Sequence, residues 1–356
     1  MSWSVPRSAR TALFAFALVA AGFPTLANSQ RVTQTNLISD VPGWAATVDP
    51  NLVNSWGIAF GPTSPVWVAD NGTGLSTLYT GTGSIVPLVV TIPPPQGVMD
   101  HSAPTGVVFN GTGSFTVSDG GKSGSALFIF DTEDGTISGW SPAVTTKHSI
   151  RVVDNSGMDA IYKGLAIGTT EKGSFIYATN FHSGWVEMYD SNFQWVKNFT
   201  DMQIPEGYAP FGIQNINGKL YVTFAKQDEA KEDDVAGPGF GFVSVFDLNG
   251  NKIKRLISMG ALNAPWGLAL APSDFGRFSG ALLVGNFGNG WINAYNASTG
   301  ALLGHLLNPN GTPLAIDGLW GLAFGTGGPS GPTNTLLFTA GPDHEEHGLF
   351  GTLTKR

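Results

Sequence analysis

The sequence contains no cysteine among its 356 residues, and only 12% of its residues are charged. Without cysteine the chain forms no disulfide, and thiol catalysis, thiolate zinc sites and iron–sulfur clusters are excluded. The sequence also lacks a cluster of lysine and arginine, and its formal net charge is −8. Because binding to phosphates requires such a cluster, we expect no nucleic-acid partner. Because the chain has no disulfides, burial of a core must stabilise the fold.

Glycine, proline and aromatic residues are abundant, with 48 Gly, 22 Pro, 10 Trp and 23 Phe. A coiled coil needs more charge and more helix formers, and a disordered chain has fewer aromatic residues. Collagen is excluded because the glycines have no period of three. This composition indicates an all-β protein made of many short strands joined by tight turns.

The N-terminus has the pattern of a signal peptide. Arg7 and Arg10 precede an apolar run over 11–23, and a small-residue cleavage site follows at Thr25-Leu26-Ala27. The run is shorter than the ~20 residues that cross a bilayer comfortably, although an uncleaved anchor helix stays open as an alternative. We expect residues 1–27 to be removed and the mature chain, 28–356, to be secreted or periplasmic with no membrane span.

A glycine that precedes an apolar run recurs six times, at intervals of 48 to 58 residues. These glycines are Gly57, Gly106, Gly164, Gly212, Gly267 and Gly321. Each run is followed by a second apolar run and by a third that ends at an aromatic residue before a turn. In the second unit we expect the second strand at 115–119 and the third at 128–131. Such a unit suits one four-stranded blade of a β-propeller.

The last unit ends without a fourth strand, whereas the mature N-terminus begins with a spare strand over 32–38. A ring closes well if this strand completes the last blade, because closure removes an exposed edge. The sequence therefore predicts a single-domain, six-bladed β-propeller of four-stranded blades. We expect it to be a monomer.

The stretches 51–59, 285–295, 318–325 and 348–351 resemble secreted six-bladed propellers with NHL-like repeats. They are most similar to an uncharacterised bacterial secreted family within that group, and the resemblance covers 31–356. It implies the architecture and no reaction, because propellers host unrelated functions. Members often carry a C-terminal sorting tail; since this sequence stops at Lys355-Arg356, we expect a freely released protein.

The starts of the inner strands and the ends of the second strands should surround one mouth of the central channel. From the strand starts, the candidate ligand-binding residues are Asn54, Trp56, Lys163, Phe211, Trp266 and Trp320. The alternative is that the aromatic residues among them wedge between blades and fill the core.

Two sets of residues are candidates for a metal site. Hard oxygen donors at the second-strand ends suit Ca²⁺ or another divalent metal, unless they only cap turns: Asp70, Asn71, Asp119, Asn180 and Asn286. The second set is the 343–347 segment, in which His344 and His347 stand among three carboxylates. Its alternative is a solvated acidic loop whose histidines respond to pH.

His182 is the candidate general base, because it follows the third second-strand end at the expected mouth. The dense charge run over 226–234 is either a lid or a solvated insertion. We therefore expect a propeller that binds a small molecule, a polymer or a protein outside the cell or in the periplasm, through the loops at the mouth. The alternative is a metal-assisted hydrolase or lyase of the calcium type at the same mouth.

Overall fold

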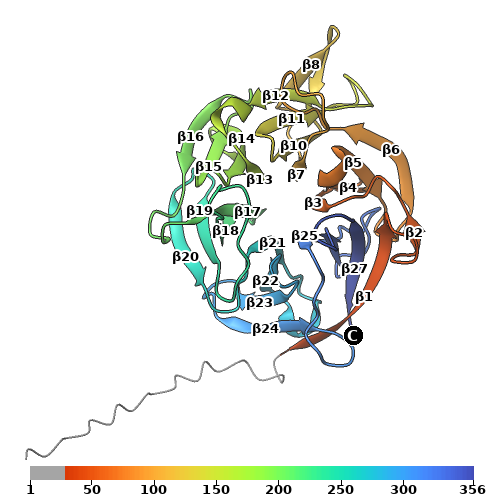
Figure 1. The fold of residues 1–356 in the computed structure, drawn as a ribbon, viewed down its shortest axis with the longest axis vertical. Coiled ribbons are helices and arrows are strands. Elements are labelled where there is room, and N and C mark those ends of the chain that lie inside the picture. The colour runs from red at the N-terminus through yellow and green to blue at the C-terminus, as the bar shows by residue number, and fades with distance from the viewer. Residues whose placement is uncertain (1–28) are drawn as a thin grey trace, which may run out of the picture.

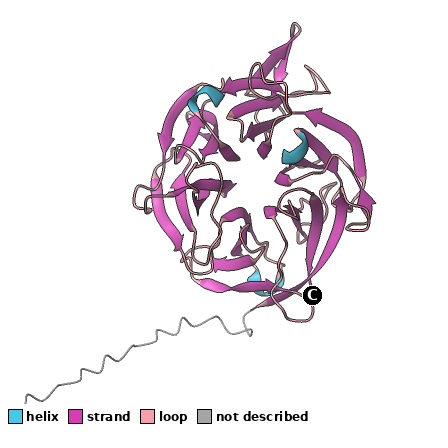
Figure 2. Cartoon of the chain, viewed as in Figure 1, coloured by secondary structure: helices cyan, strands magenta, loops and turns pink. Residues whose placement is uncertain are grey.

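The computed structural model describes residues 29–356, so the predicted signal peptide lies outside the described residues. Within them the chain is almost entirely β-strand, with short 3₁₀ helices at η2 (Asn71–Thr73), η3 (Ser156–Met158) and η4 (Gly276–Phe278). The sheets stand around a ring, with β3, β7, β13, β17, β21 and β25 nearest its centre (Figure 1). Figure 2 shows how little helix interrupts the strands.

Four of the sheets contain four strands each, in meander order apart from one inserted hairpin. The first contains β3 (Ser55–Ala59), β4 (Val66–Asp70), β5 (Leu75–Tyr79) and β6 (Ile85–Thr91). The second contains β7 (Pro104–Phe109), β10 (Phe128–Thr132), β11 (Thr136–Trp140) and β12 (Ile150–Asp154). The third contains β13 (Tyr162–Thr170), β14 (Gly173–Asn180), β15 (Trp185–Tyr189) and β16 (Trp195–Phe199). The fourth contains β17 (Tyr208–Ile216), β18 (Lys219–Lys226), β19 (Phe242–Asp247) and β20 (Lys252–Ser258).

The remaining large sheet joins the two ends of the described chain. Its strands follow the order β21-β22-β23-β24-β1-β27-β26-β25, and the short β2 (Thr47–Val48) pairs with β1 outside this path. The bounds are β1 (Gln30–Ser39), β21 (Pro265–Leu270), β22 (Ala281–Asn286), β23 (Ile292–Asn296), β24 (Leu302–Leu307), β25 (Leu319–Phe324), β26 (Leu336–Ala340) and β27 (Leu349–Lys355).

Strand β1 closes this sheet as the sequence predicted for 32–38. It pairs antiparallel with β27, from Val32 opposite Lys355 to Ser39 opposite Leu349. Its contact with β24 is parallel and brief, with Gln30 opposite Leu306 and Arg31 opposite Leu307. The N-terminal strand therefore covers the edge of β27 that would otherwise present unpaired backbone groups.

The repeated glycines allow the inner strands to approach one another closely. A Cβ on Gly212 would lie 2.2 Å from the backbone oxygen of Trp266, and one on Gly267 would lie 2.4 Å from that of Trp320. In both cases the obstructing atom belongs to the neighbouring inner strand, β21 for Gly212 and β25 for Gly267. Only glycine fits at these positions, because the backbone of a neighbouring strand cannot move aside as a side chain could.

Threonines on the second strands connect adjacent sheets beside these glycines. The Oγ1 of Thr339 accepts a hydrogen bond from the Gly321 amide at 2.9 Å and donates to the backbone oxygen of Trp56 in the next sheet. Thr179 likewise donates to the backbone oxygen of Phe211 at 2.6 Å. Polar backbone groups that the close approach would leave buried are thereby paired.

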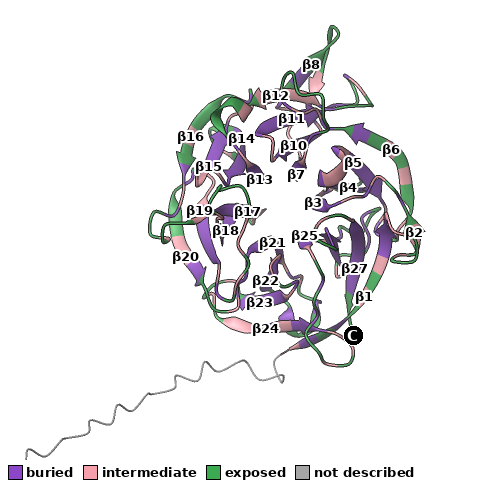
Figure 3. Cartoon of the chain, in the orientation of Figure 1, coloured by how far each residue is buried: buried purple, intermediate pink, exposed green. Residues whose placement is uncertain are grey.

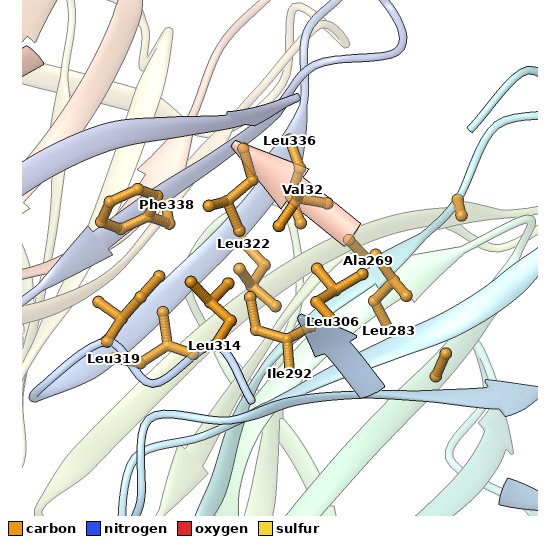
Figure 4. Close-up of a cluster of buried hydrophobic side chains, with 14 of the residues drawn as sticks. Val32, Ala269, Leu283, Ile292, Leu306, Leu314, Leu319, Leu322, Leu336 and Phe338 are labelled. Carbon is orange, nitrogen blue, oxygen red and sulfur yellow. The ribbon is translucent and has the colours of Figure 1, made fainter. Parts of the chain in front are cut away.

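Apolar side chains fill the wedges between neighbouring sheets rather than one central core. In the largest cluster Val32 of β1 and Leu306 of β24 lie among Leu322 and Phe338 of β25 and β26 (Figure 4). Figure 3 shows buried residues along the inner and middle strands, while exposed residues gather on the outer strands and loops. This arrangement explains the low content of charge, since most strand faces lie against another sheet.

The strand assignment in the second unit was wrong. Strand β8 (Thr116–Asp119), where we expected a second blade strand, pairs only with β9 (Lys122–Ser125) in a separate two-stranded sheet. In the four-stranded second sheet, the strand next to the inner strand β7 is β10. Figure 1 shows β8 projecting from the ring. A local alternation of apolar residues is the same in a hairpin insertion and in a blade strand, so only the pairing with β7 distinguishes them.

Candidate functional site

One end of the ring carries the connections from second to third strands together with the starts of the inner strands. The antiparallel register places Ser55 opposite Asp70, Pro265 opposite Asn286, and Leu319 opposite Ala340. The same pairing recurs in the third sheet. We call this end the mouth face. It is the end at which the sequence predicted a site.

Aromatic rings close the channel axis at the mouth face. The aromatic plug, as we name it, consists of Trp56, Phe181, Phe211 and Trp320, each at most 1% exposed. Trp56 and Trp320 stack with ring centroids 3.5 Å apart, and Phe287 stacks on Trp320 at 4.1 Å. Three of the predicted ligand-binding residues thus fill the core of the ring, as in the alternative considered from the sequence.

Below the plug, the channel narrows to a small cavity. It has a volume of about 40 Å³ and is lined by inner-strand residues that include Gly57, Gly106 and Leu165. A water molecule needs roughly 10–15 Å³ of such space, so the cavity holds a few waters at most. A ligand at the mouth face would therefore bind above the plug and not inside the channel.

Two more of the predicted ligand-binding residues, Trp266 and Asn54, support the mouth from beneath. Trp266 is partly buried and donates from Nε1 to the backbone oxygen of Lys163 at 2.7 Å. Asn54 is buried; its Nδ2 donates to Asn71 and to Glu345, each at 3.1 Å, and its Oδ1 accepts from Trp320. These contacts orient the plug and the loops above it.

Lys163 is a buried ammonium at the centre of the mouth, with a side chain only 2% exposed. It pairs with Glu133 and, at 3.0 Å, with Asp233. Its Nζ also lies 5.4 Å from the ring centroid of Trp56 and 5.9 Å from that of Phe181. Burial alone would lower the pKa of Lys163, but the two carboxylates outweigh burial and raise it above its usual value. Lys163 is therefore a permanent cation.

Glu133 and Asp233, the two partners of this lysine, line a pocket with a volume of about 560 Å³. The acidic pocket, as we call it, is also lined by His182, Ser156, Ala160 and Ile161. Its six carboxylates come from four loops that are distant in sequence: Glu133, Asp134, Asp159, Glu232, Asp233 and Glu345. Six potential negative charges thus stand against the single positive charge of Lys163.

The pKa values of two acidic groups reflect this crowding. Burial raises the pKa of Glu345 to about 7, and the negative charges of Glu133, Asp233 and Asp234 add to the effect against Lys163. Burial likewise raises the pKa of Asp234 to about 7, although Lys163 opposes it. Near neutral pH the pocket therefore holds protons that an arriving cation would displace.

The structure does not bring the predicted oxygen donors together. Asn180 donates from Nδ2 to Glu187 at 2.8 Å, and Asn286 to the backbone oxygen of Ala261 at 2.9 Å. Asn71 reaches the acidic pocket by donating to Glu133 at 2.6 Å, while Asp70 is buried in its own sheet. Within residues 29–356, no group of three or more His, Cys, Asp or Glu is arranged to hold a metal ion.

Asp119 was wrongly placed at the mouth. Its side chain is 58% exposed at the end of β8, and its carboxylate lies 3.8 Å from Nε2 of His148. Because β8 belongs to the inserted hairpin, the position that corresponds to Asp70 in the second sheet is Thr132, directly before Glu133. The misassigned strand therefore concealed Glu133.

The histidines of the 343–347 loop do not converge on one site either. His347 contacts Asp40 through Nδ1 at 2.8 Å and packs edge-on against Trp44. His344 is exposed. The residue of this loop that lines the acidic pocket is Glu345. His182 does line that pocket, as expected for a residue at the mouth.

Sequence reasoning singled out both charged loops but not the residues that matter in them. Asp233 lies in the 226–234 run, and Glu345 in the 343–347 cluster. Glu133 was not among the candidate site residues. Aligning the second sheet on Gly106 and β10 would have placed Glu133 beside Lys163.

The fold and this mouth define the protein as a β-propeller. Virginiamycin B lyase from Staphylococcus aureus has a TM-score of 0.51 at 12% identity, covering 91% of this chain and 99% of that one. A catalytically inactive form of that lyase with quinupristin has a TM-score of 0.53 at 12% identity, with the same coverage. A luciferin-regenerating enzyme has a TM-score of 0.51 at 13% identity, covering 85% of this chain and 92% of that one. At such identities the likeness concerns the fold alone.

Sequence comparison finds relatives of higher identity than these solved structures. Two uncharacterized proteins of Acanthamoeba polyphaga mimivirus are each 35% identical to it, over 331 and 332 residues. Both alignments cover 90% of this chain, and they cover 79% and 84% of the viral proteins. The chain belongs to the same protein family as these two viral proteins.

No family model matches the chain. The relatives are viral, so they lend no support to the resemblance to a bacterial secreted family. Among the residues that the structure describes, no helix is long and apolar enough to cross a membrane.

Proposed function

We propose that this protein is a secreted or periplasmic, six-bladed β-propeller that binds a lysine- or arginine-bearing segment of a partner protein in the acidic pocket. The observation that carries the proposal is the excess of carboxylates over cations there. Lys163 neutralises Glu133 and Asp233 only in part, and the pocket walls add Asp134, Glu232 and Glu345.

The depth of the pocket suits a long cationic side chain. Asp233 at the rim has a side chain that is 76% exposed, whereas Glu133 beside Lys163 is 25% exposed. A volume of about 560 Å³ lies in the range of small binding sites, ~300–1,000 Å³. The carboxylate at the rim would attract a lysine or arginine as it approaches, and the deeper carboxylate would pair with it once it is bound. Anionic polymers would be repelled.

The proposed blade count rests on the sheet composition. Four sheets have four strands, and the long path β21-β22-β23-β24-β1-β27-β26-β25 divides into two groups of four at the short parallel contact between β24 and β1. Each group then has one inner strand that starts at the mouth face. This division matches the six repeated glycines.

A peptide titration tests the proposal. We expect an oligolysine peptide to bind the mature protein and an oligoglutamate peptide of equal length not to bind. Binding should weaken as salt is raised, because the rim charges are screened. The double variant Glu232→Gln, Glu345→Gln should weaken binding about tenfold, since each partly exposed pair contributes roughly 0.7 kcal/mol.

Glu171→Gln is the matched control, because Glu171 is exposed at the β13–β14 turn, at the end of the sheet opposite the mouth face. It should leave the affinity unchanged. Equal affinity for both peptides, or an equal effect of the pocket and control variants, would contradict the proposal.

The second candidate is the metal-assisted hydrolase or lyase, with His182 as base. One observation favours it: His182 lines the acidic pocket among carboxylates. Against it, the ammonium of Lys163 already occupies the position between Glu133 and Asp233 that a metal ion would take. His182→Ala should therefore leave peptide binding intact, and loss of a metal-dependent hydrolytic activity in that variant would favour the enzyme instead.

A further inference from the structure

A second group of buried polar side chains lies away from the acidic pocket. The Asp70 cluster, as we name it, consists of Asp49, Asp70, Thr77 and Tyr79, all at most 5% exposed. Tyr79 stacks on Phe350 of β27 with ring centroids 5.5 Å apart. Strand alternation directs Thr77 and Asp70 to the same side as Tyr79. The cluster therefore lies where the first sheet packs against the strands that close the ring.

The oxygens of this cluster have too few donors. Asp70 is 0% exposed, and neither of its carboxylate oxygens has a hydrogen-bond partner; the same holds for Oγ1 of Thr77. Asp49 accepts from the Tyr79 hydroxyl at 2.9 Å and from the amide and side chain of Asn51 at 3.0 and 2.9 Å, and it lies near enough to Asp70 for its charge to act on it. In residues 29–356, no ion pair includes Asp49 or Asp70. A buried carboxylate without donors is strongly unfavourable.

The corresponding positions of the third sheet show how the chain satisfies a buried carboxylate elsewhere. There Asn180, Glu187 and Tyr189 stand where Asp70, Thr77 and Tyr79 stand in the first sheet. Glu187 accepts from the Asn180 amide at 2.8 Å, and from the hydroxyls of Tyr189 at 2.5 Å and Tyr162 at 2.7 Å. Asp70 lacks such a set of donors, although its neighbour Asp49 has them.

A third version of the same arrangement lies on β22 and β23. Asn286, Asn293 and Tyr295 occupy the corresponding positions, and their Oδ1 and hydroxyl oxygens are also buried without partners. All three side chains are neutral, so no buried charge is left without a counter-charge there. The Asp70 cluster differs because it contains two carboxylates.

From this contrast we propose that the Asp70 cluster binds one structural divalent cation of the calcium type. Asp70 supplies both carboxylate oxygens, and Asp49 and Thr77 supply further oxygen ligands. Hard oxygen donors are those that Ca²⁺ prefers, and two carboxylates balance its two charges. The ion would tie the first sheet to the segment that follows β2, next to the strands that close the ring.

Thermal unfolding of the mature protein tests this site. After treatment with a chelator, addition of CaCl₂ should raise the unfolding midpoint by about 4 °C at roughly 100 times the dissociation constant. NaCl at equal ionic strength should not. Equilibrium dialysis with radioactive calcium should show one ion bound per chain.

Asp70→Asn removes the charge and places there the residue that the third sheet carries. It should abolish both the midpoint shift and the bound ion. Asp131→Asn is the matched control, because Asp131 is equally buried but accepts from the Gly106 amide at 2.6 Å and from Thr105 at 3.0 Å. It should keep the full response to calcium, and Asp49→Asn serves as a second test if Asp70→Asn does not fold.

Two results would overturn the proposal. A calcium response that survives in Asp70→Asn but disappears in Glu345→Gln would place the ion in the acidic pocket. The absence of any response, with Asp70→Asn as stable as the unaltered protein or more so, would mean that Asp70 is a buried neutral acid.

Discussion

Replacement of Glu345 by glutamine should stabilise the protein at alkaline pH and leave its stability unchanged at acidic pH. The folded protein raises the pKa of Glu345 from about 4.5 to about 7, chiefly by burial and then by the nearby carboxylates. A shift of that size corresponds to roughly 3 kcal/mol. Glutamine keeps an oxygen that can accept from Asn54 Nδ2, so the variant loses the charge but not the contact.

The direction of this pH dependence of stability follows from proton binding. Between pH 4.5 and 7 the folded state binds the Glu345 proton more tightly than the unfolded state does, so stability falls as the pH rises through this window. The loss of stability caused by the charged Glu345 is complete above pH 7 and absent well below pH 4.5. Glu345→Gln should therefore raise the unfolding midpoint by about 4 °C at pH 8 and by nearly nothing at pH 4.

Thermal unfolding across this pH range, read by circular dichroism, measures the effect. Glu346→Gln is the control, because Glu346 belongs to the same loop but is exposed, and it should not alter the pH dependence. Parallel stability curves for Glu345→Gln and the unaltered protein would refute the argument that Glu345 is held in an unfavourable charged state.

Three further substitutions probe the mouth and the ring. Lys163→Met should destabilise the protein by about 3–5 kcal/mol in urea unfolding, because Glu133 loses its buried partner; an effect below ~1 kcal/mol would mean that solvent compensates the carboxylates. Trp320→Ala should lower the free energy of unfolding by about 3–5 kcal/mol, since it opens the aromatic plug. Urea unfolding checks this too, and a loss as small as that of a surface substitution, about 0.5 kcal/mol, would contradict it. Thr339→Val should cost about 1–3 kcal/mol because the Gly321 amide is left unpaired, and amide exchange at Gly321 should accelerate.

The regular features of the fold could be predicted because each depends on local sequence. The repeated glycines and the three apolar runs that follow them predicted strands in meander order. The spare strand at 32–38 predicted the closure of the last sheet, which the pairing of β1 with β27 confirms. The second unit was the exception. The hairpin β8–β9 has the same local pattern as a blade strand, and only the pairing of β10 with β7 shows which one belongs to the ring.

Most of the candidate site could not be predicted in this way. Lys163, His182 and Asn71 were placed at the mouth, but the carboxylates that give it its character come from segments as distant as Glu133, Asp233 and Glu345. Nothing in the local pattern of any one segment indicates the others. Likewise, the sequence predicted Asp70, Asn180 and Asn286 as equivalent oxygen donors. In the structure Asn180 donates to Glu187 and Asn286 to Ala261, whereas the Asp70 carboxylate has no hydrogen-bond partner.

The sequence by itself determined the repeat, the strands, the lack of disulfides and the strand that closes the last sheet. These follow from backbone conformation, side-chain alternation and composition, which act over a few residues. Tertiary structure alone decided that the tryptophans fill the axis, that the carboxylates gather around Lys163 and that Asp70 lacks donors. The physical reason is that burial and charge interactions depend on distance in space, and ring closure brings together residues that are far apart along the chain.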